Sequence, residues 1–269
     1  MVSDDPGALR ALAERLAVEA GTLAMHERSA LGPGRISHDT KSTTTDPVTE
    51  FDRAAERLLV DRLREARPDD AIVGEEGAGI AGTTGNEWHL DPIDGTANFV
   101  YGLPAWCTSV GVVDLHGGLA GAVFAPVSGE LFSAARGGGA SLNGDPISAS
   151  NCTKLDDALV ATGFAYRPER RRRQAQRLAA IIGEIRDVRR GGSAALDLCL
   201  VACGRVDAYY EQHLNSWDIA AGLLIAAEAG ATTSDDRGGP AAPEFTVASA
   251  PGVQRALLDA LARSAPGRN

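Results

Sequence analysis

Lysine is almost absent from this chain of 269 residues: only Lys41 and Lys154 occur, and arginine supplies the remaining basic side chains. Acidic residues outnumber basic ones by 36 to 26, so the net charge is −10. An overall basic field that attracts nucleic acid is therefore missing, and we do not expect direct nucleic-acid binding. An acidic protein that handles an anionic ligand needs a local source of positive charge, which a bound cation can supply.

Cysteines and long apolar runs are scarce as well. Four cysteines without a C-x-x-C pair do not make a disulfide scaffold in a chain of this length. The N-terminus lacks the basic and apolar regions of a signal peptide. The longest apolar run, residues 219–227, is far shorter than the roughly 20 residues that a membrane span needs. We therefore expect a cytoplasmic protein with reduced thiols and no membrane association.

The hydrophobic pattern predicts a mixture of helices and strands. Apolar residues recur at helical spacing in residues 8–28, 50–65 (with Thr49 as N-cap), 168–186, 193–203, 218–229 and 252–263. Strand-like runs cover residues 71–73, 88–90, 106–113, 119–125, 131–134, 157–162, 206–210 and 245–248. The three runs between 106 and 134 form a meander. Mixed strands and helices with an antiparallel meander indicate a layered α+β or α/β fold.

Acidic residues stand at the ends of predicted elements that are far apart in the chain. Glu75 follows the strand-like run 71–73, Asp91 and Asp94 follow the run 88–90, and Asp218 opens a helix. Because strand ends gather at one edge of a sheet, these acids can converge in one cleft. Convergent carboxylates repel one another and are costly to bury, and a divalent cation relieves that cost. Hard oxygen ligands suit Mg²⁺, and a bridging carboxylate would give a two-metal site.

The residues after these acids suit phosphate chemistry. Hydrolysis of phosphate monoesters requires accelerations of up to ~10²¹-fold, and two cations can together activate water and stabilise the leaving oxygen. Gly95 allows backbone amides to approach a phosphate, and a helix that begins there adds favourable partial charge. Thr96 can position the attacking water and pass its proton to an acid. An isolated Asp-Gly turn is often only a surface loop, but together with Glu75 and Asp218 it predicts a phosphatase of small phosphorylated alcohols.

Four other features of the sequence can be considered as signs of a different function or of a further site, and each is a weaker sign than the acidic residues. Residues 77–82 match G-x-G-x-x-G but lead into a turn, whereas a dinucleotide site needs a helix. Cys199 and Arg205 have C-x5-R spacing, yet Cys199 lies in an apolar run that is typical of an inert core cysteine. His213 is close enough in sequence to Glu211 to border a pocket. The arginine run 170–173 is most simply a solvated helix face, with a role in substrate approach or partner binding left open.

Two motifs resemble those of the inositol monophosphatase family, and the likeness covers nearly the whole chain. They are WHLDPIDGTANF at 88–99 and WDIAAG at 217–222, and segments 46–52, 74–77 and 207–211 support them. Within the family the likeness is greatest to the SuhB-type inositol-1-monophosphatases of actinobacteria, which share the run GSAALDLC at 192–199. The resemblance implies a layered αβαβα sandwich, an α+β fold of the sugar-phosphatase type. Residues 1–269 would form a single domain with subdomains of about 1–145 and 146–269.

The resemblance also implies an activity and a set of site residues. The enzyme would hydrolyse myo-inositol 1-phosphate with two or three Mg²⁺ ions, would be lithium-sensitive and would form a homodimer. The implied metal ligands are Glu75, Asp91, the Ile93 carbonyl, Asp94 and Asp218. Asp52 would pair with Thr96 to activate water, with Glu75 as a further catalytic residue. Contacts to phosphate and polyol would come from Asp94, Gly95, Thr96, Gly192, Ser193, Ala194, Glu211 and Asp218. Lys41 would lie on a mobile loop near a third metal.

Two departures and several alternatives remain. Ala97 and Ser193 stand where many relatives carry threonine, which alters substrate contacts but no metal ligand. Fructose 1,6-bisphosphate, histidinol phosphate and nucleoside 3′,5′-bisphosphate are alternative substrates on the same scaffold. A third hypothesis is a binding role in a transcription complex, as for some SuhB relatives.

Overall fold

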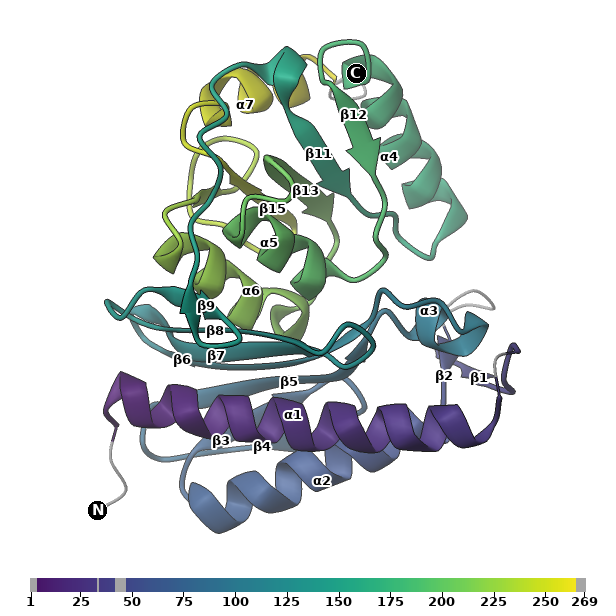
Figure 1. Cartoon of the computed structure of the whole chain (residues 1–269), viewed down its shortest axis with the longest axis vertical. Coiled ribbons are helices and arrows are strands. Elements are labelled where there is room, and N and C mark those ends of the chain that lie inside the picture. Colours follow the sequence, from purple (N-terminus) through teal and green to yellow (C-terminus); the bar gives the residue numbers. More distant parts are fainter. Residues whose placement is uncertain (1–3, 33, 42–46, 265–269) are drawn as a thin grey trace.

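The computed structural model describes residues 4–32, 34–41 and 47–264, and its elements stack in five layers (Figure 1). Helices α1 (Pro6–Ala30) and α2 (Glu50–Ala66) cover one face of an eight-stranded sheet, and α5 (Ala194–Ala202) and α6 (Ser216–Glu228) cover the other. A five-stranded sheet follows, and α4 (Pro168–Ile181) and α7 (Gln254–Arg263) lie outside it. The predicted αβαβα fold of the α+β class is confirmed.

The eight-stranded sheet has the order β10-β9-β8-β7-β6-β5-β3-β4. Its strands are β3 (Ala71–Gly74), β4 (Gly79–Ile80), β5 (Glu87–Asp94), β6 (Cys107–Asp114), β7 (Gly117–Ala125), β8 (Glu130–Ala135), β9 (Ala140–Leu142) and β10 (Asp145–Pro146). The expected meander is present as β6, β7 and β8, which pair antiparallel. Strands β3 and β5 are parallel, so both run toward the same edge of the sheet.

The five-stranded sheet has the order β12-β11-β13-β15-β14. It comprises β11 (Leu159–Thr162), β12 (Asp187–Arg189), β13 (Ala208–Gln212), β14 (Thr232–Ser234) and β15 (Phe245–Ser249). The first sheet ends at Pro146 and the second begins at Leu159, with a short 3₁₀ helix (Leu155–Asp157) between them. The division into subdomains of about 1–145 and 146–269 stays a prediction.

Several local features of the structure can be compared with the sequence expectations; one helix is shorter than expected, and one pair of strands was not predicted. The Arg-rich helix α4 ends at Ile181 rather than at about 186, and Gly183, a poor helix former, follows it. A helix does begin after Gly95: α3 (Thr96–Tyr101). The strands β1 (Asp39–Thr40) and β2 (Pro47–Val48) form a two-stranded pair. The G-x-G-x-x-G segment contains β4 and leads on to β5 without an intervening helix.

Two glycines let the central helix α6 lie close to the first sheet. A Cβ atom on Gly111 of β6 would come 2.8 Å from the backbone nitrogen of Ala221, and one on Gly121 of β7 would come 2.9 Å from its Cα. Such distances are shorter than real Cβ contacts, so a larger residue at either position would push the helix away. The close contact fixes the height of α6 above the sheet and therefore the position of Asp218 in its first turn.

A buried ion pair secures the start of β3. Asp70 accepts hydrogen bonds from Arg67 Nε at 2.6 Å, Thr84 Oγ1 at 2.6 Å and Trp88 Nε1 at 2.8 Å. Burial raises the pKa of Asp70, but these three donors outweigh it, and the pKa lies below its usual range. The pair ties α2, β3 and β5 together at the end of the sheet remote from the acidic strand ends.

Candidate active site

A bulge in β5 turns two aspartates to the same side of the sheet. Asp91 pairs with Ser109 and Asp94 with Cys107, so three residues of β5 advance while β6 advances by two. Residues three apart in a regular strand point to opposite faces, and the extra residue removes that alternation. Both side chains are buried. The extra residue at Pro92-Ile93 therefore allows both aspartate side chains to point to the same face of the sheet.

The parallel pairing of β3 and β5 places a third acid beside them. Gly74 is in register with Leu90, and the Glu75 amide donates to the Leu90 carbonyl at 3.1 Å. Glu75 is thus the neighbour of Asp91 at the sheet edge. Burial raises the pKa of Glu75, and the charge of Glu75 adds to burial in raising the pKa of Asp91. The expectation that strand ends bring these acids together is confirmed.

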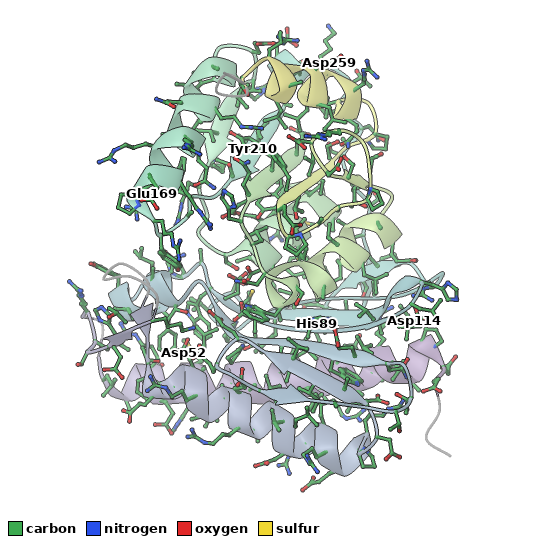
Figure 2. All side chains as sticks on the ribbon, turned by 180° about the vertical axis from the view of Figure 1, so that it is seen from behind. Asp52, His89, Asp114, Glu169, Tyr210 and Asp259 are labelled. Atoms are coloured by element: carbon green, nitrogen blue, oxygen red, sulfur yellow. The ribbon has the colours of Figure 1, made fainter. Side chains whose placement is uncertain are left out.

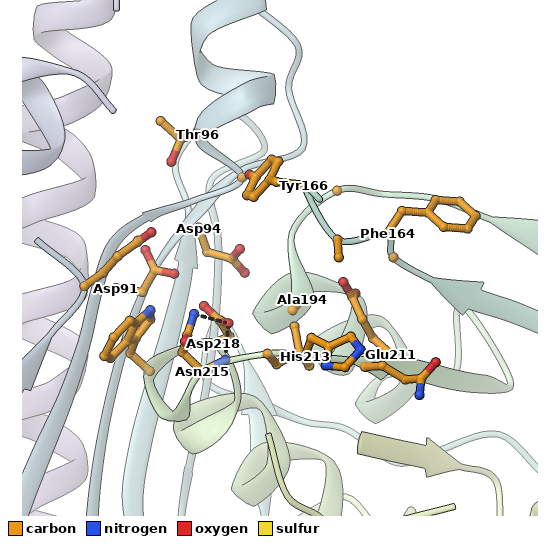
Figure 3. A pocket seen from close by; sticks show the side chains of 18 of the residues that line it. Asp91, Asp94, Thr96, Phe164, Tyr166, Ala194, Glu211, His213, Asn215 and Asp218 are labelled. Atoms are coloured by element: carbon orange, nitrogen blue, oxygen red, sulfur yellow. Dashed lines mark hydrogen bonds between the residues drawn. The ribbon is translucent and has the colours of Figure 1, made fainter. Parts of the chain in front are cut away.

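The fourth acid comes from helix α6, on the other side of the cavity. Asp218 caps its own helix: its Oδ2 accepts from the Asn215 backbone nitrogen at 2.6 Å and from Asn215 Nδ2 at 3.3 Å. Figure 3 shows these bonds, with Asp218 below Asp94 and with Glu211 farther to the right. The capping box therefore orients the Asp218 carboxylate toward the acids of β5.

These four carboxylates, of which Asp91 and Asp94 are buried and Glu75 and Asp218 half-buried, have raised pKa values. Burial, followed by the charges of Glu75, Asp94 and Asp218, raises the pKa of Asp91 well above its usual range. Burial and then the charges of Asp94 and Glu75 do the same for Asp218. The pKa of Asp94 is raised to about 6 by burial, although the hydroxyl of Ser193 opposes it. Four converging acids that resist ionisation fit a site for hard divalent cations, which stabilise the charged form.

Each of these carboxylates is engaged by other groups. Lys41 Nζ donates to Glu75 Oε1 at 2.7 Å and also to Glu76, and Asp94 Oδ2 accepts from Ser193 Oγ and from the Ala195 amide, both at 2.7 Å. Among the described residues, no three Asp, Glu, His or Cys side chains are already arranged around one point as metal ligands.

Asp52 and Thr96 form the predicted pair. Thr96 Oγ1 lies 3.2 Å from Asp52 Oδ1 and 3.0 Å from the Ile93 carbonyl oxygen, and its single proton goes to one acceptor at a time. Asp52 projects from the first turn of α2 (Figure 2), where Oδ2 accepts from the Thr49 amide at 2.8 Å and from the Thr49 hydroxyl. Burial raises the pKa of Asp52 to about 7, although the hydrogen bond from Thr49 lowers it.

The turn between β5 and α3 requires glycine at position 95. Gly95 has φ of +94°, and an added Cβ would lie 3.0 Å from the Ala105 carbonyl oxygen and 3.2 Å from that of Gly192. This packing brings the start of α3 against the segment 192–194. Gly192 and Ala194 line the cavity as expected, whereas the Ser193 side chain is buried and bonds to Asp94.

Glu211 lies at the far side of the same cavity. The parallel register of β11 and β13 aligns Thr162 with Tyr210, which puts Gly163 next to Glu211. A Cβ on Gly163 would lie 1.9 Å from Glu211 Oε2, so only glycine leaves room for this side chain. The hydroxyl of Tyr209 donates to Glu211 Oε2 at 2.9 Å. Burial raises the pKa of Glu211 to about 7, with Tyr209 and Arg190 opposing it.

One cavity of about 420 Å³ brings nearly all the predicted site residues together. Its lining includes Lys41, Glu75, Asp91, Ile93, Asp94, Gly95, Thr96, Gly192, Ala194, Glu211 and Asp218. Asp52 and Ser193 are buried next to the cavity. Asp52 accepts a hydrogen bond from Thr96, and Ser193 donates one to Asp94, so both residues hold lining residues in place. His213 also lines the cavity. In Figure 3, Asp91 lies on one side of the pocket and Glu211, His213 and Phe164 lie on the other.

Two supporting residues escaped the sequence analysis. Glu56 accepts the backbone amides of Glu76 at 2.7 Å and Ala78 at 3.0 Å, and so holds the turn that carries Glu75. The sequence feature that could have identified Glu56 is its position one helical turn after Asp52, on the buried side of α2. Tyr209, which holds Glu211, gives no local signal, because an aromatic residue in a strand is usually core.

None of the helices in the described part of the chain combines the length and apolar content that crossing a bilayer requires.

Comparison with known proteins gives consistent matches along the chain. Residues 5–266 match the model of the inositol monophosphatase family. A protein of Mycobacterium leprae named inositol-1-monophosphatase is 48% identical over 279 residues, which span 97% of this chain and 95% of that protein. The solved structure of Mycobacterium tuberculosis SuhB has a TM-score of 0.82 and 44% identity, covering 97% of this chain and 98% of that one.

A relative with a different name also matches. A Xylella fastidiosa protein named Nus factor SuhB is 41% identical over 206 residues, covering 76% of this chain and 74% of that protein.

Proposed function

This chain belongs to the inositol monophosphatase family, and from that premise we propose that it hydrolyses myo-inositol 1-phosphate to inositol and inorganic phosphate. The observation that supports this most strongly is the Thr96–Asp52 pair beside four carboxylates that line one cavity. A hydroxyl paired with a base can manage the proton of a water, and the carboxylates can hold the cations that a phosphate monoester needs.

Phosphate is received at the junction of β5 and α3. Gly95 and Thr96 line the cavity at the start of α3, and a helix N-terminus favours a negative charge. Glu75, Asp91, the Ile93 carbonyl, Asp94 and Asp218 would hold the cations. When bound, such cations neutralise phosphate charge and lower the pKa of water.

The proton of the attacking water passes to buried side chains of this chain. Thr96 donates its own proton toward Asp52 and offers a lone pair to the water. Water adds its oxygen to phosphorus, the bond between phosphorus and the inositol oxygen breaks, and the inositol oxygen takes up a proton from solvent water. Asp52, which lies 3.2 Å from Thr96 Oγ1, accepts the proton relayed by Thr96. Glu75, next to Asp91, contributes to orienting the water.

The polyol is recognised on the Glu211 side of the cavity. Glu211 accepts a hydrogen bond from an inositol hydroxyl, and its second contact, from Tyr209, fixes its orientation. The backbone at Gly192 and Ala194 forms the surface against which the ring lies. A neutral ring with several hydroxyls suits a wall that offers both an acceptor and backbone groups.

Metal dependence is a property of this family, and we propose that the ions here are Mg²⁺, two or three in number, with Lys41 near the third. Hard carboxylate ligands and a need for bound water favour Mg²⁺. Lithium sensitivity, a homodimer and a cytoplasmic location are part of the same proposal.

The substrate is tested by a panel ranked by kcat/KM at titrated Mg²⁺, with and without lithium. We expect myo-inositol 1-phosphate to rank above fructose 1,6-bisphosphate, histidinol phosphate and nucleoside 3′,5′-bisphosphate. A higher rank for any of these three would move the assignment to that substrate on the same scaffold.

A second function is supported by the Nus factor relative. A binding role in a transcription complex would not exclude catalysis. The net charge of −10 argues against direct RNA contact, so the partner would be a protein. A pull-down with purified RNA polymerase tests it, and no retained polymerase would count against it.

A further inference from the structure

The cavity has a second charged wall that the proposed reaction does not use. Arg167 and Arg170 line it, from the N-cap and the first turn of α4. Arg190 lines it from the segment before α5, where a Cβ on Gly192 would lie 2.4 Å from Arg190 Nη1. Arg190 acts on acids of the site, since its charge opposes burial in setting the pKa of Glu211. Burial and then the charge of Arg170 lower the pKa of His213, which also lines the cavity.

Within the described residues, neither Arg167 nor Arg170 forms an ion pair, although exposed arginines nearby do. Arg186 lies 3.2 Å from Asp157 and Arg189 lies 2.8 Å from Asp187. Glu169 stands between the two arginines in sequence, at the N-terminal end of α4 (Figure 2), but it does not line the cavity. Five carboxylates line the same cavity: Glu75, Asp91, Asp94, Glu211 and Asp218. Among the described residues, none of them lies within ion-pair distance of the two guanidinium groups, which therefore remain available to a ligand.

Hydrogen bonds from side chains of α4 hold the segment that carries these arginines in place. Arg171 donates from Nε to the Ala165 carbonyl at 3.1 Å and from Nη2 to the Tyr166 carbonyl at 2.7 Å. The Ala165 amide donates to Gln174 Oε1 at 2.7 Å, and Gln174 Nε2 donates to the Gln212 carbonyl at 3.3 Å. Gln174 is buried. The wall is therefore tied to the strand that carries Glu211, and a site on such a support is preorganised.

A neutral polyol does not require two unpaired cations. Arginine recognises phosphate through charge-assisted and often paired hydrogen bonds. In a protein of net charge −10, two neighbouring arginines without an ion-pair partner would favour an anionic ligand at this wall of the cavity. We propose that Arg167 and Arg170 bind a second phosphate group, carried by the polyol on the side of the ring away from the scissile phosphate. The favoured substrates are then inositol bisphosphates. This inference rests on the proposed function for the scissile 1-phosphate.

The test compares myo-inositol 1,4-bisphosphate with myo-inositol 1-phosphate, because position 4 lies across the ring from position 1. The variant is Arg167→Gln with Arg170→Gln. The matched control is Arg172→Gln with Arg173→Gln, which changes two exposed arginines of α4 that do not line the cavity. Circular dichroism melting verifies that both variants fold.

The wild-type protein should release phosphate from position 1 with a higher kcat/KM for the bisphosphate than for the monophosphate. The cavity variant should lower kcat/KM for the bisphosphate by about 10- to 100-fold, because hydrogen bonds between charged groups are lost. Its kcat/KM for the monophosphate should fall much less, and the control should keep the wild-type preference. An equal fall for both substrates, or no wild-type preference, would overturn the proposal.

Binding separates this proposal from the proposed function. Calorimetry on Asp52→Asn, in which turnover should be slow, measures affinity for both compounds, with and without the two arginine changes. If the wild-type enzyme fails to hydrolyse inositol 1-phosphate, the proposed function fails. The arginine site still stands if the bisphosphate binds more tightly and the arginine changes remove that difference. It fails if the two compounds bind equally.

Discussion

Replacing Asp94 with asparagine should stabilise the metal-free protein while removing its activity. Asp94 is buried near Asp91 and Asp218, and burial raises its pKa from 3.8 to about 6. The native state therefore keeps the proton to a higher pH than the unfolded chain does. Stability must then fall as pH rises from about 4 to about 6, and it stays lower above that range.

The size of the effect follows from the shift. One pKa unit corresponds to 1.36 kcal/mol, so ionised Asp94 lowers the free energy of unfolding by about 3 kcal/mol above pH ~6. Asparagine carries no charge, and its amide oxygen can still accept from Ser193 Oγ and the Ala195 amide. Allowing for relaxation, we expect Asp94→Asn to be more stable by about 1–3 kcal/mol at neutral pH and by about zero near pH 4.

Urea unfolding followed by circular dichroism measures this at several pH values, in EDTA and in Mg²⁺. Magnesium should stabilise the wild-type protein, because binding to the native state adds to its stability, and should stabilise Asp94→Asn much less. Asp145→Asn, a change of an exposed aspartate in β10, is the control. An Asp94→Asn protein that is less stable than wild type in EDTA at neutral pH would refute the reasoning.

Three further predictions concern side chains around the site and the ion pair at β3. Asp52→Asn replaces the carboxylate 3.2 Å from Thr96 Oγ1 with an amide that can accept a hydrogen bond but cannot take up the proton; kcat should fall by about 10²- to 10⁴-fold while calorimetry still detects Mg²⁺, and an unchanged kcat would remove Asp52 from the mechanism. Tyr209→Phe removes the hydrogen bond to Glu211 and should raise KM for inositol 1-phosphate about 2- to 10-fold; a change in kcat alone would speak against a positioning role. Asp70 has a lowered pKa, so its stabilisation exists above the unfolded value near 4 and disappears as pH falls through the folded value. Asp70→Asn should cost about 3–5 kcal/mol at neutral pH and little in acid, and equal losses at both would contradict the ion-pair account.

Much of the acidic site could be predicted because its placement depends on local patterns. Glu75 and Asp91 follow strand-like runs, and parallel strands end at one edge. The bulge at Pro92-Ile93 could not be predicted from such local patterns. The sequence showed two acids three apart, but only the pairing with β6 explains how both reach the same side.

The polyol side of the cavity could be predicted only through the family resemblance. The role of Gly163 depends on the register of β11 against β13, which brings it beside Glu211. The length of β12, three residues, is set by pairing with β11 rather than by its own pattern. The arginine run was interpreted as a solvated helix face, which describes Arg172 and Arg173; Arg170 lines the cavity.

The central claim is that the carboxylates that line the cavity hold the metal on which hydrolysis of inositol 1-phosphate depends. The most direct measurement is phosphate release from myo-inositol 1-phosphate by metal-stripped protein as Mg²⁺ is titrated back, for wild type and Asp91→Asn. The account predicts no release without Mg²⁺, saturable recovery in the wild-type protein and no recovery in Asp91→Asn. Robust release from the stripped wild-type protein, or full recovery in Asp91→Asn, would contradict it.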